Sequence, residues 1–251
     1  MSWVKLAVGM VFMALATVAH AVVLLALLPW RNARIRSCNH WGHVVGRACM
    51  ALSGSTVSVE GQQHLDGARP AIYVSNHTSV LDIFLGIWLA PVGTVGVAKK
   101  EVIFYPFFGQ LYWMSGHLRI DRGNHDRAVA AMRELGDIVR RYKLSIWMWP
   151  EGTRSRDGRL RPFKKGLVHL AVETGLPVVP VVVVGAHRAW EKGTQRIVGV
   201  PIAVRVLPPV DTSAWAGRST EACLEEVHAR FREALPEDQL PALVSAGGAV
   251  A

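Results

Sequence analysis

From residue 56 onward, short apolar runs alternate with longer amphipathic stretches. Seven runs have the length and composition of buried strands: "TVSVEG", "AIYVS", "VGTVGVA", "LRI", "LSIWMW", "VVPVVVVG" and "IAVRVL". Between them, residues 124–142 place apolar side chains at helical spacing, with Asp126 in the first turn and Arg140 and Arg141 in the last. A further helix is expected over residues 218–235. The alternation predicts an α/β fold with a mixed, largely parallel sheet flanked by helices.

The N-terminal stretch has a different pattern. Residues 6–30 contain no Asp, Glu, Lys or Arg, and His20 is their only ionisable side chain. As a helix, about 25 residues would cover roughly 37 Å, against roughly 30 Å of bilayer hydrocarbon. The alternatives are a buried soluble helix or a cleaved signal peptide, but the stretch is long for a signal and "PWRNARIRSC" offers no convincing cleavage site. We expect a retained anchor that either spans the bilayer or lies deep in one leaflet.

Positive charge follows this stretch. Lys5 precedes it, whereas Arg31, Arg34, Arg36 and Arg47 come after it, which places the rest of the chain in the cytoplasm by the positive-inside rule. The same region mixes Arg, His and Trp with apolar residues, as in a helix that lies at a membrane interface.

Three parts of the chain are therefore expected. Residues 1–55 form a membrane anchor and interfacial helix, residues 56–235 an α/β domain, and residues 236–251 a flexible tail of small, polar or weakly apolar residues. The chain has 251 residues, of which 51% are hydrophobic, enough to form a sizeable core.

The formal net charge of +9 favours an anionic partner, which could be nucleic acid, acidic lipid or a phosphorylated substrate. Lipid is the better choice once an anchor is present, so we expect no nucleic-acid partner. Three cysteines without a spacing pattern fit a reducing compartment.

A histidine and an aspartate follow one of the predicted strands. In "NHTSVLD", His77 and Asp82 are five positions apart, so they meet only if the turn between them bends favourably. Spacing alone leaves a structural role for both residues open. Helix capping is the role expected for Asn76, Thr78 and Ser79.

Two more groups of polar residues follow strands. "WPEGTRSRDGRLRPFKKG", residues 149–166, combines three glycines with many cationic side chains, a composition suited to holding phosphate. A solvated basic loop is the alternative. In "GHLRIDRG", Arg122 lies just beyond a short strand. Because the carboxyl ends of parallel strands meet at one edge of a sheet, all three groups are expected there.

"NHTSVLD", "GHLRIDR", "WPEGTRS" and "LPVVPV" resemble, in order and spacing, the four sequence blocks of the lysophosphatidic acid acyltransferase family. The segment "AKKEVIFYPFFGQLYW" is similar to the bacterial 1-acyl-sn-glycerol-3-phosphate acyltransferases as well. The resemblance implies a glycerolphosphate acyltransferase-like fold, catalysis by His77 with Asp82 as its partner, and a place at the cytoplasmic face of the cell inner membrane. It also implies these substrate-binding residues: Lys99, Arg122, Glu151, Gly152, Thr153, Arg154 and Pro180. Thr78 and Trp149 depart from it, since many members have Gln at the first position and Phe or Tyr at the second.

The implied reaction transfers an acyl group without a covalent enzyme intermediate. His77 would take the proton of the sn-2 hydroxyl of lysophosphatidic acid, and backbone N–H groups around Gly152 would stabilise the oxyanion. The acyl donor would be acyl-CoA or acyl carrier protein, and no cofactor or metal is expected. No "GxSxG" motif occurs to supply a serine nucleophile.

Other functions are open on the residues alone. A metal hydrolase could use His77, Asp82 and Glu151, although the chain lacks "HExxH". Cys38, His40, His43 and Cys49 have the residue types of a zinc site, but their spacing matches no zinc finger. A basic module that binds acidic lipid, or an acyltransferase for another lysolipid such as lyso-ornithine lipid, are further alternatives.

Overall fold

The computed structural model describes residues 2–65, 70–121, 123, 125–191 and 193–242. Seven strands form one sheet in the order β1-β7-β6-β2-β5-β3-β4. The strands are β1 Thr56–Glu60, β2 Ile72–Ser75, β3 Thr94–Lys99, β4 Leu118–Ile120, β5 Ser145–Met148, β6 Val178–Val184 and β7 Pro201–Val206. Each coincides with one of the seven apolar runs, so the predicted strands are confirmed.

The sheet is mixed, as expected. Neighbouring strands from β6 to β4 run parallel, β7 runs antiparallel to β6, and β1 runs parallel to β7. The carboxyl ends of β2, β3, β4 and β5 therefore lie along one edge, where the segments after these strands begin. β6 is buried along almost its whole length, which explains its nearly continuous run of valines.

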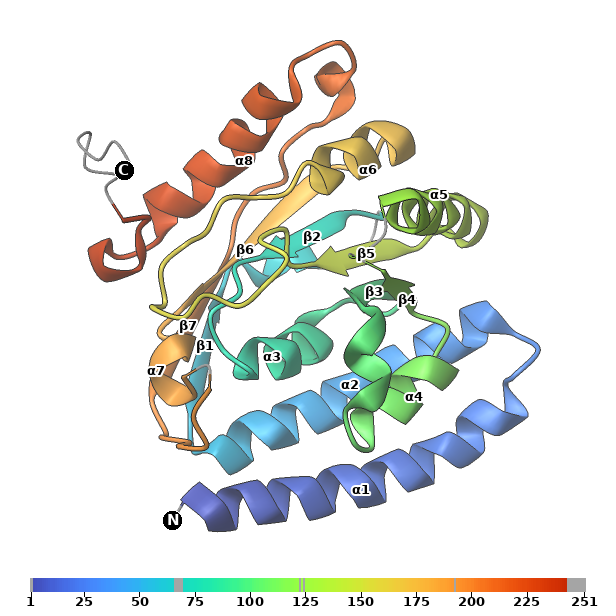
Figure 1. Ribbon diagram of the computed structural model, residues 1–251, viewed down its shortest axis with the longest axis vertical. Helices are drawn as coiled ribbons and strands as arrows, with labels where there is room; N and C mark the ends of the chain where they lie inside the picture. The colour runs from blue at the N-terminus through green and yellow to red at the C-terminus, as the bar shows by residue number, and fades with distance from the viewer. Residues whose placement is uncertain (1, 66–69, 122, 124, 192, 243–251) are drawn as a thin grey trace.

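Helices cover both faces of the sheet (Figure 1). The α-helices are α1 Ser2–Ala26, α2 Arg31–Ser53, α3 Leu81–Leu89, α4 Phe108–Met114, α5 His125–Tyr142, α6 Gly166–Thr174, α7 Ala186–Ala189 and α8 Thr220–Ala234. Short 3-10 helices are η1 Gln62–Leu65, η2 Lys100–Phe104, η3 Ser213–Trp215 and η4 Glu237–Gln239. α5, α6 and α8 lie on one face, and α2 and α3 on the other.

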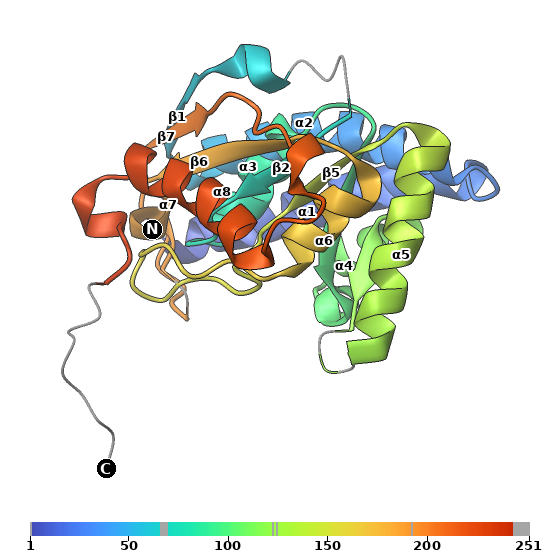
Figure 2. The same cartoon turned by 90° about the horizontal axis from the view of Figure 1, so that it is seen from above.

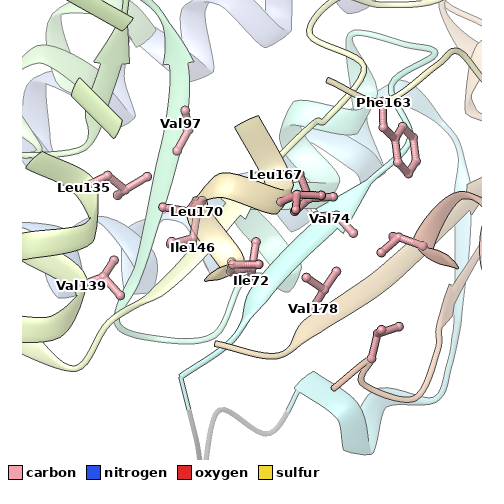
Figure 3. Close-up of a cluster of buried hydrophobic side chains, with 14 of the residues drawn as sticks. Ile72, Val74, Val97, Leu135, Val139, Ile146, Phe163, Leu167, Leu170 and Val178 are labelled. Atoms are coloured by element: carbon pink, nitrogen blue, oxygen red, sulfur yellow. The ribbon is translucent and has the colours of Figure 1, made fainter. Parts of the chain in front are cut away.

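The core is divided by the sheet because side chains alternate along each strand. Ile72 and Val74 of β2 pack with Leu167 and Leu170 of α6 on one face (Figure 3). Tyr73, between them in sequence, packs in the cluster on the opposite face, which includes residues of α2 and α3. Two apolar layers thus fix the sheet from both sides.

α2 packs against the rest of the fold along one side, and its predicted place at a membrane interface stays a prediction. It lies between α1 and the sheet, and it buries residues such as Ile35, Val45 and Met50 (Figure 1). Two glycines let it approach α3 closely: a Cβ added at Gly46 would lie 2.5 Å from the carbonyl oxygen of Phe84. This close packing joins α2 firmly to α3.

α1 is docked along its whole length. Lys5 donates a hydrogen bond to the Ser53 carbonyl at 2.7 Å, and Trp41 donates from its indole to the Ala16 carbonyl at 3.2 Å. Leu24, near the other end, is fully buried. By length and composition, the helix over Trp3–Ala26 is apolar enough to cross a membrane, with a mean hydropathy of 2.3. Its outer side carries a row of exposed apolar residues: Val4, Val8, Val11, Leu15, Val18, Val22 and Leu25.

The expected flexible tail begins later than residue 236. Gln239 in η4 is fully buried, and its side chain accepts a hydrogen bond from the Gly185 N–H at 2.8 Å. Its carbonyl accepts another from the Leu160 N–H at 2.9 Å. The expectation is therefore wrong as far as Gln239, and residues 243–251 lie outside the described part of the chain.

Replacing Gly46 tests the close approach of α2 and α3. Gly46→Ala should lower the free energy of unfolding by about 1 to 3 kcal/mol, since its methyl group has no room against the backbone of α3. Chemical denaturation in detergent measures the change. Gly9→Ala in α1 is the matched control, because nothing lies within 4 Å of its added Cβ. A Gly46→Ala protein as stable as the control would contradict the packing described.

Candidate active site

The segment after β2 is held to the sheet by a side chain. Asn76 donates from its amide nitrogen to the Val183 carbonyl and accepts from the Val183 N–H, both at 2.8 Å. This contact, and not helix capping, is the role of Asn76. It anchors the residue immediately before His77 to β6.

His77 and Asp82 are brought together by a bend of the intervening turn. One carboxylate oxygen of Asp82, Oδ2, accepts the backbone N–H groups of Thr78 at 2.6 Å and Ser79 at 2.7 Å. The same oxygen lies 3.0 Å from Nδ1 of His77. The Asp82 side chain is fully buried, whereas 13% of the His77 side chain is exposed. The imidazole is thus oriented by a buried carboxylate and keeps access to solvent.

Trp149 supports the other side of the imidazole. The rings of His77 and Trp149 are stacked, with centroids 4.9 Å apart and planes at 26°. Trp149 follows β5 directly and stands where many family members have Phe or Tyr. Its larger indole also provides an aromatic surface for the histidine.

The turn after Trp149 fixes the backbone of His77. Glu151 Oε1 accepts the His77 N–H at 2.8 Å, and the Ser155 N–H donates to the His77 carbonyl at 2.8 Å. Burial raises the pKa of the Glu151 carboxyl to about 8, and the nearby charge of Asp82 acts in the same direction. Glu151 is only 1% exposed and is not among the residues that line the cavity described below. Its contact with the His77 N–H supports a positioning role, and the substrate contact expected from the sequence stays a prediction.

A cavity of about 610 Å³ opens in front of His77. It collects several of the expected residues at the carboxyl edge of the sheet: His77, Lys99, Gly152, Thr153 and Arg154. Its walls come from the N-terminal half of α1, the start of α3, and the segment from β3 through η2 to α4. Cationic side chains and the imidazole thus share one largely apolar chamber.

Two expected substrate residues do not reach this cavity. Pro180 is buried within β6, where it pairs in register with Val74 of β2. It therefore shapes the sheet, and no direct contact with substrate is supported. Arg122 lies outside the described residues.

Gly152 adopts the left-handed conformation, with φ of 75°, that favours glycine. Its N–H donates to the Trp149 carbonyl at 3.1 Å and closes the turn. The N–H of Gly152 itself is therefore directed into the turn, which does not support the expected role in binding an oxyanion.

The described residues contain no group of three or more His, Cys, Asp or Glu side chains that could hold a metal ion. Cys38, His40, His43 and Cys49 all lie on α2, and the imidazole of His43 contacts the Ala90 carbonyl at 2.8 Å. Among the described residues, therefore, neither the metal hydrolase nor the zinc site suggested by the sequence has a set of three ligands.

The family described as Acyltransferase matches residues 56–184, just over half of the chain. This chain belongs to the acyltransferase family. The match includes β1 through β6 and therefore His77, Asp82 and the turn that supports them.

Relatives of this acyltransferase extend the similarity beyond that region. A 1-acyl-sn-glycerol-3-phosphate acyltransferase of Limnanthes douglasii is 44% identical over 241 residues, covering 96% of this chain and 85% of the relative. The Escherichia coli K12 protein of the same name is 37% identical over 175 residues, 70% of each chain. The crystal structure of the acyltransferase PlsC from Thermotoga maritima matches with a TM-score of 0.70 and 24% identity, covering 93% of this chain and 96% of that one. The structural likeness supports the fold.

Sequence reasoning missed the contribution of α1 to the site. Leu6, Met10 and Met13 line the cavity together with Lys5, yet composition marks this helix only as a membrane anchor. The one sequence feature that could have indicated this role is Lys5, the only charged residue in the first 30 positions.

The buried Glu151 should make stability depend on pH. Its pKa is raised from 4.5 to about 8 in the folded acyltransferase, so the folded chain keeps a proton that the unfolded chain loses. Between these values the free energy of unfolding should fall with rising pH, by up to about 5 kcal/mol relative to Glu151→Gln. Urea unfolding across this range measures the difference, with Glu233→Gln, an exposed site, as the control. Parallel pH profiles for wild type and Glu151→Gln would rule out the buried, protonated carboxyl.

Proposed function

We propose that this chain transfers a fatty acyl group from an acyl thioester to the sn-2 hydroxyl of 1-acyl-sn-glycerol-3-phosphate, forming phosphatidic acid. The observation that carries the proposal is the 3.0 Å contact of His77 with a buried carboxylate, facing a cavity that also contains Lys99 and Arg154. The names of the relatives agree with this substrate and reaction.

His77 acts as the general base. With Nδ1–H directed to Asp82, the neutral imidazole presents Nε2 as the acceptor for the hydroxyl proton. As the proton moves to Nε2, the sn-2 oxygen forms a bond to the thioester carbonyl carbon. The thiolate leaves and takes the proton from the imidazolium, whose charge Asp82 stabilises.

The acyl group passes directly to the acceptor. Cys49 is the one cysteine that lines the cavity, and burial raises the pKa of its thiol to about 12. A thiol of that pKa is almost entirely protonated near neutral pH and is a poor nucleophile. This supports a mechanism without a covalent acyl-enzyme.

Lys99 and Arg154 bind the acceptor phosphate. Lys99 ends β3, Arg154 lies in the turn after β5, and both side chains line the same cavity as His77. Fixing the phosphate determines which hydroxyl group meets the imidazole. Arg122 remains a predicted third contact.

The protein acts at a membrane surface, on the cytoplasmic side of the inner membrane. α1 is docked along the domain and exposes its apolar row on the outer side, an arrangement suited to lying in one leaflet. The donor is acyl-CoA or acyl carrier protein, and transfer assays with both thioesters distinguish them.

Removing the base or its partner tests the mechanism. His77→Ala should lower kcat by about 10² to 10⁴-fold, and Asp82→Asn should also lower kcat, because the imidazole loses the charge that stabilises its protonated form. Phosphatidic acid formation by the purified protein is the readout. His40→Ala, at an exposed position of α2, is the matched control. A His77→Ala protein that forms phosphatidic acid at the wild-type rate would overturn the general-base role, whereas a wild type that binds acidic lipid and forms no phosphatidic acid would point to a lipid-binding module.

Lys99 tests phosphate recognition. Lys99→Met should lower kcat/KM for the phosphorylated acceptor by roughly 10 to 100-fold, through loss of a charge-assisted contact. With a monoacylglycerol, which lacks the phosphate, the variant and the wild type should be equal. Lys100→Met is the control, because the neighbouring Lys100 is paired with Asp121 at 2.9 Å and does not line the cavity. Wild-type indifference to the phosphate would favour another lysolipid as acceptor.

A further inference from the structure

Large aromatic side chains are exposed in the segment from the end of η2 through α4. Phe104 is 77% exposed, Trp113 60% and Tyr105 58%. Exposure of three large aromatic residues to this extent within ten positions is costly in water, and such patches mark interaction surfaces. We call residues 104–113 the aromatic hook.

The hook has a fixed shape. Phe107 has φ of 64°, in the left-handed region that disfavours a residue with a side chain. Gly109 is packed so closely that an added Cβ would lie 2.4 Å from the Val102 carbonyl oxygen and 2.5 Å from that of Ile103. The aromatic side chains are therefore held outward by a tightly folded turn.

The hook packs against α1. Leu111 of α4 packs with Leu24 of α1, and Phe108 packs against the cluster that contains Met13. In Figures 1 and 2, α4 lies beside α1 on the side of the molecule away from α8. The inner side of the hook thus rests on α1, so the exposed aromatic residues belong to an element that is packed directly on the apolar helix.

Both elements also line the cavity. Met10 and Met13 of α1 and Tyr105 and Phe108 of the hook are among its lining residues, together with His77. A lipid bound beside α1 and the hook would therefore lie next to the chamber that contains the imidazole.

We propose that the aromatic hook is a second membrane-inserting element, which penetrates the lipid interface beside α1 and forms one side of the entrance for the acceptor. Trp and Tyr are suited to the interface, where an apolar ring and a polar group are both satisfied. The inference rests on the proposed lipid substrate and on the membrane contact of α1.

Site-specific fluorescence tests the insertion. The three natural cysteines are buried, so a cysteine introduced at an exposed position can be labelled selectively with an environment-sensitive fluorophore. Phe104→Cys and Trp113→Cys, mixed with phosphatidylethanolamine–phosphatidylglycerol vesicles, should shift to shorter wavelength and be quenched by doxyl-labelled lipid. Leu15→Cys on the outer side of α1 is the positive control, and Val172→Cys on α6 the negative control.

Aqueous emission at positions 104 and 113, with quenching at position 15, would overturn the inference and leave the proposed function intact. Aqueous emission at all four positions would overturn both the inference and the membrane contact of α1. Insertion is read from the fluorophore and does not require activity.

Kinetics separate lipid entry from catalysis. Phe104 and Trp113 do not line the cavity, so Phe104→Ser/Trp113→Ser should keep wild-type activity on a short-chain, water-soluble acceptor. Vesicle binding should fall by about tenfold, together with activity on a vesicle-embedded acceptor. Val172→Ser is the control. Unchanged vesicle binding, or equal loss on both acceptors, would overturn the role of the hook, whereas a wild type inactive on both would overturn the proposed function.

Discussion

The rest of the site depends on the hydrogen bonds of the Asp82 carboxylate. A buried carboxylate is unfavourable unless hydrogen bonds satisfy it. Oδ2 accepts two backbone N–H groups and contacts the imidazole of His77, whereas Oδ1 has no hydrogen-bond partner among the described residues. The same bonds bend the turn between β2 and α3. The turn after β5 then docks on the backbone of His77 through Glu151 and Ser155.

The strands and the edge that holds the site could be predicted because both depend on local patterns. Each strand is an apolar run bounded by polar residues, and parallel strands place their carboxyl ends together. The direction of individual side chains could not be predicted in this way. Glu151 follows the same strand as Gly152, yet it faces inward because it binds the backbone of His77. Gln239 is a polar residue in a polar tail, and only its long-range hydrogen bonds explain its burial.

The anchor helix was correctly identified as apolar, but composition could not separate its two sides. One side of α1 faces outward, and the other packs on α2 and lines the cavity. Both sides need apolar residues, so hydropathy alone gives the same result for lipid contact and for protein packing. The distinction depends on docking contacts from Lys5 and Trp41, which are remote in sequence from the residues they hold.

The Asn76 amide also explains how the chain can leave the sheet so abruptly before its histidine. One carboxamide offers a donor and an acceptor, as a peptide unit does, so the side chain replaces the next rung of the ladder between β2 and β6. The main chain is then released from pairing one residue early and can turn toward the cavity. Aspartate has nearly the same shape, but an ionised carboxylate would leave the Val183 carbonyl without its donor. The identity of this residue is thus set by the needs of the neighbouring strand and not by the chemistry beside it.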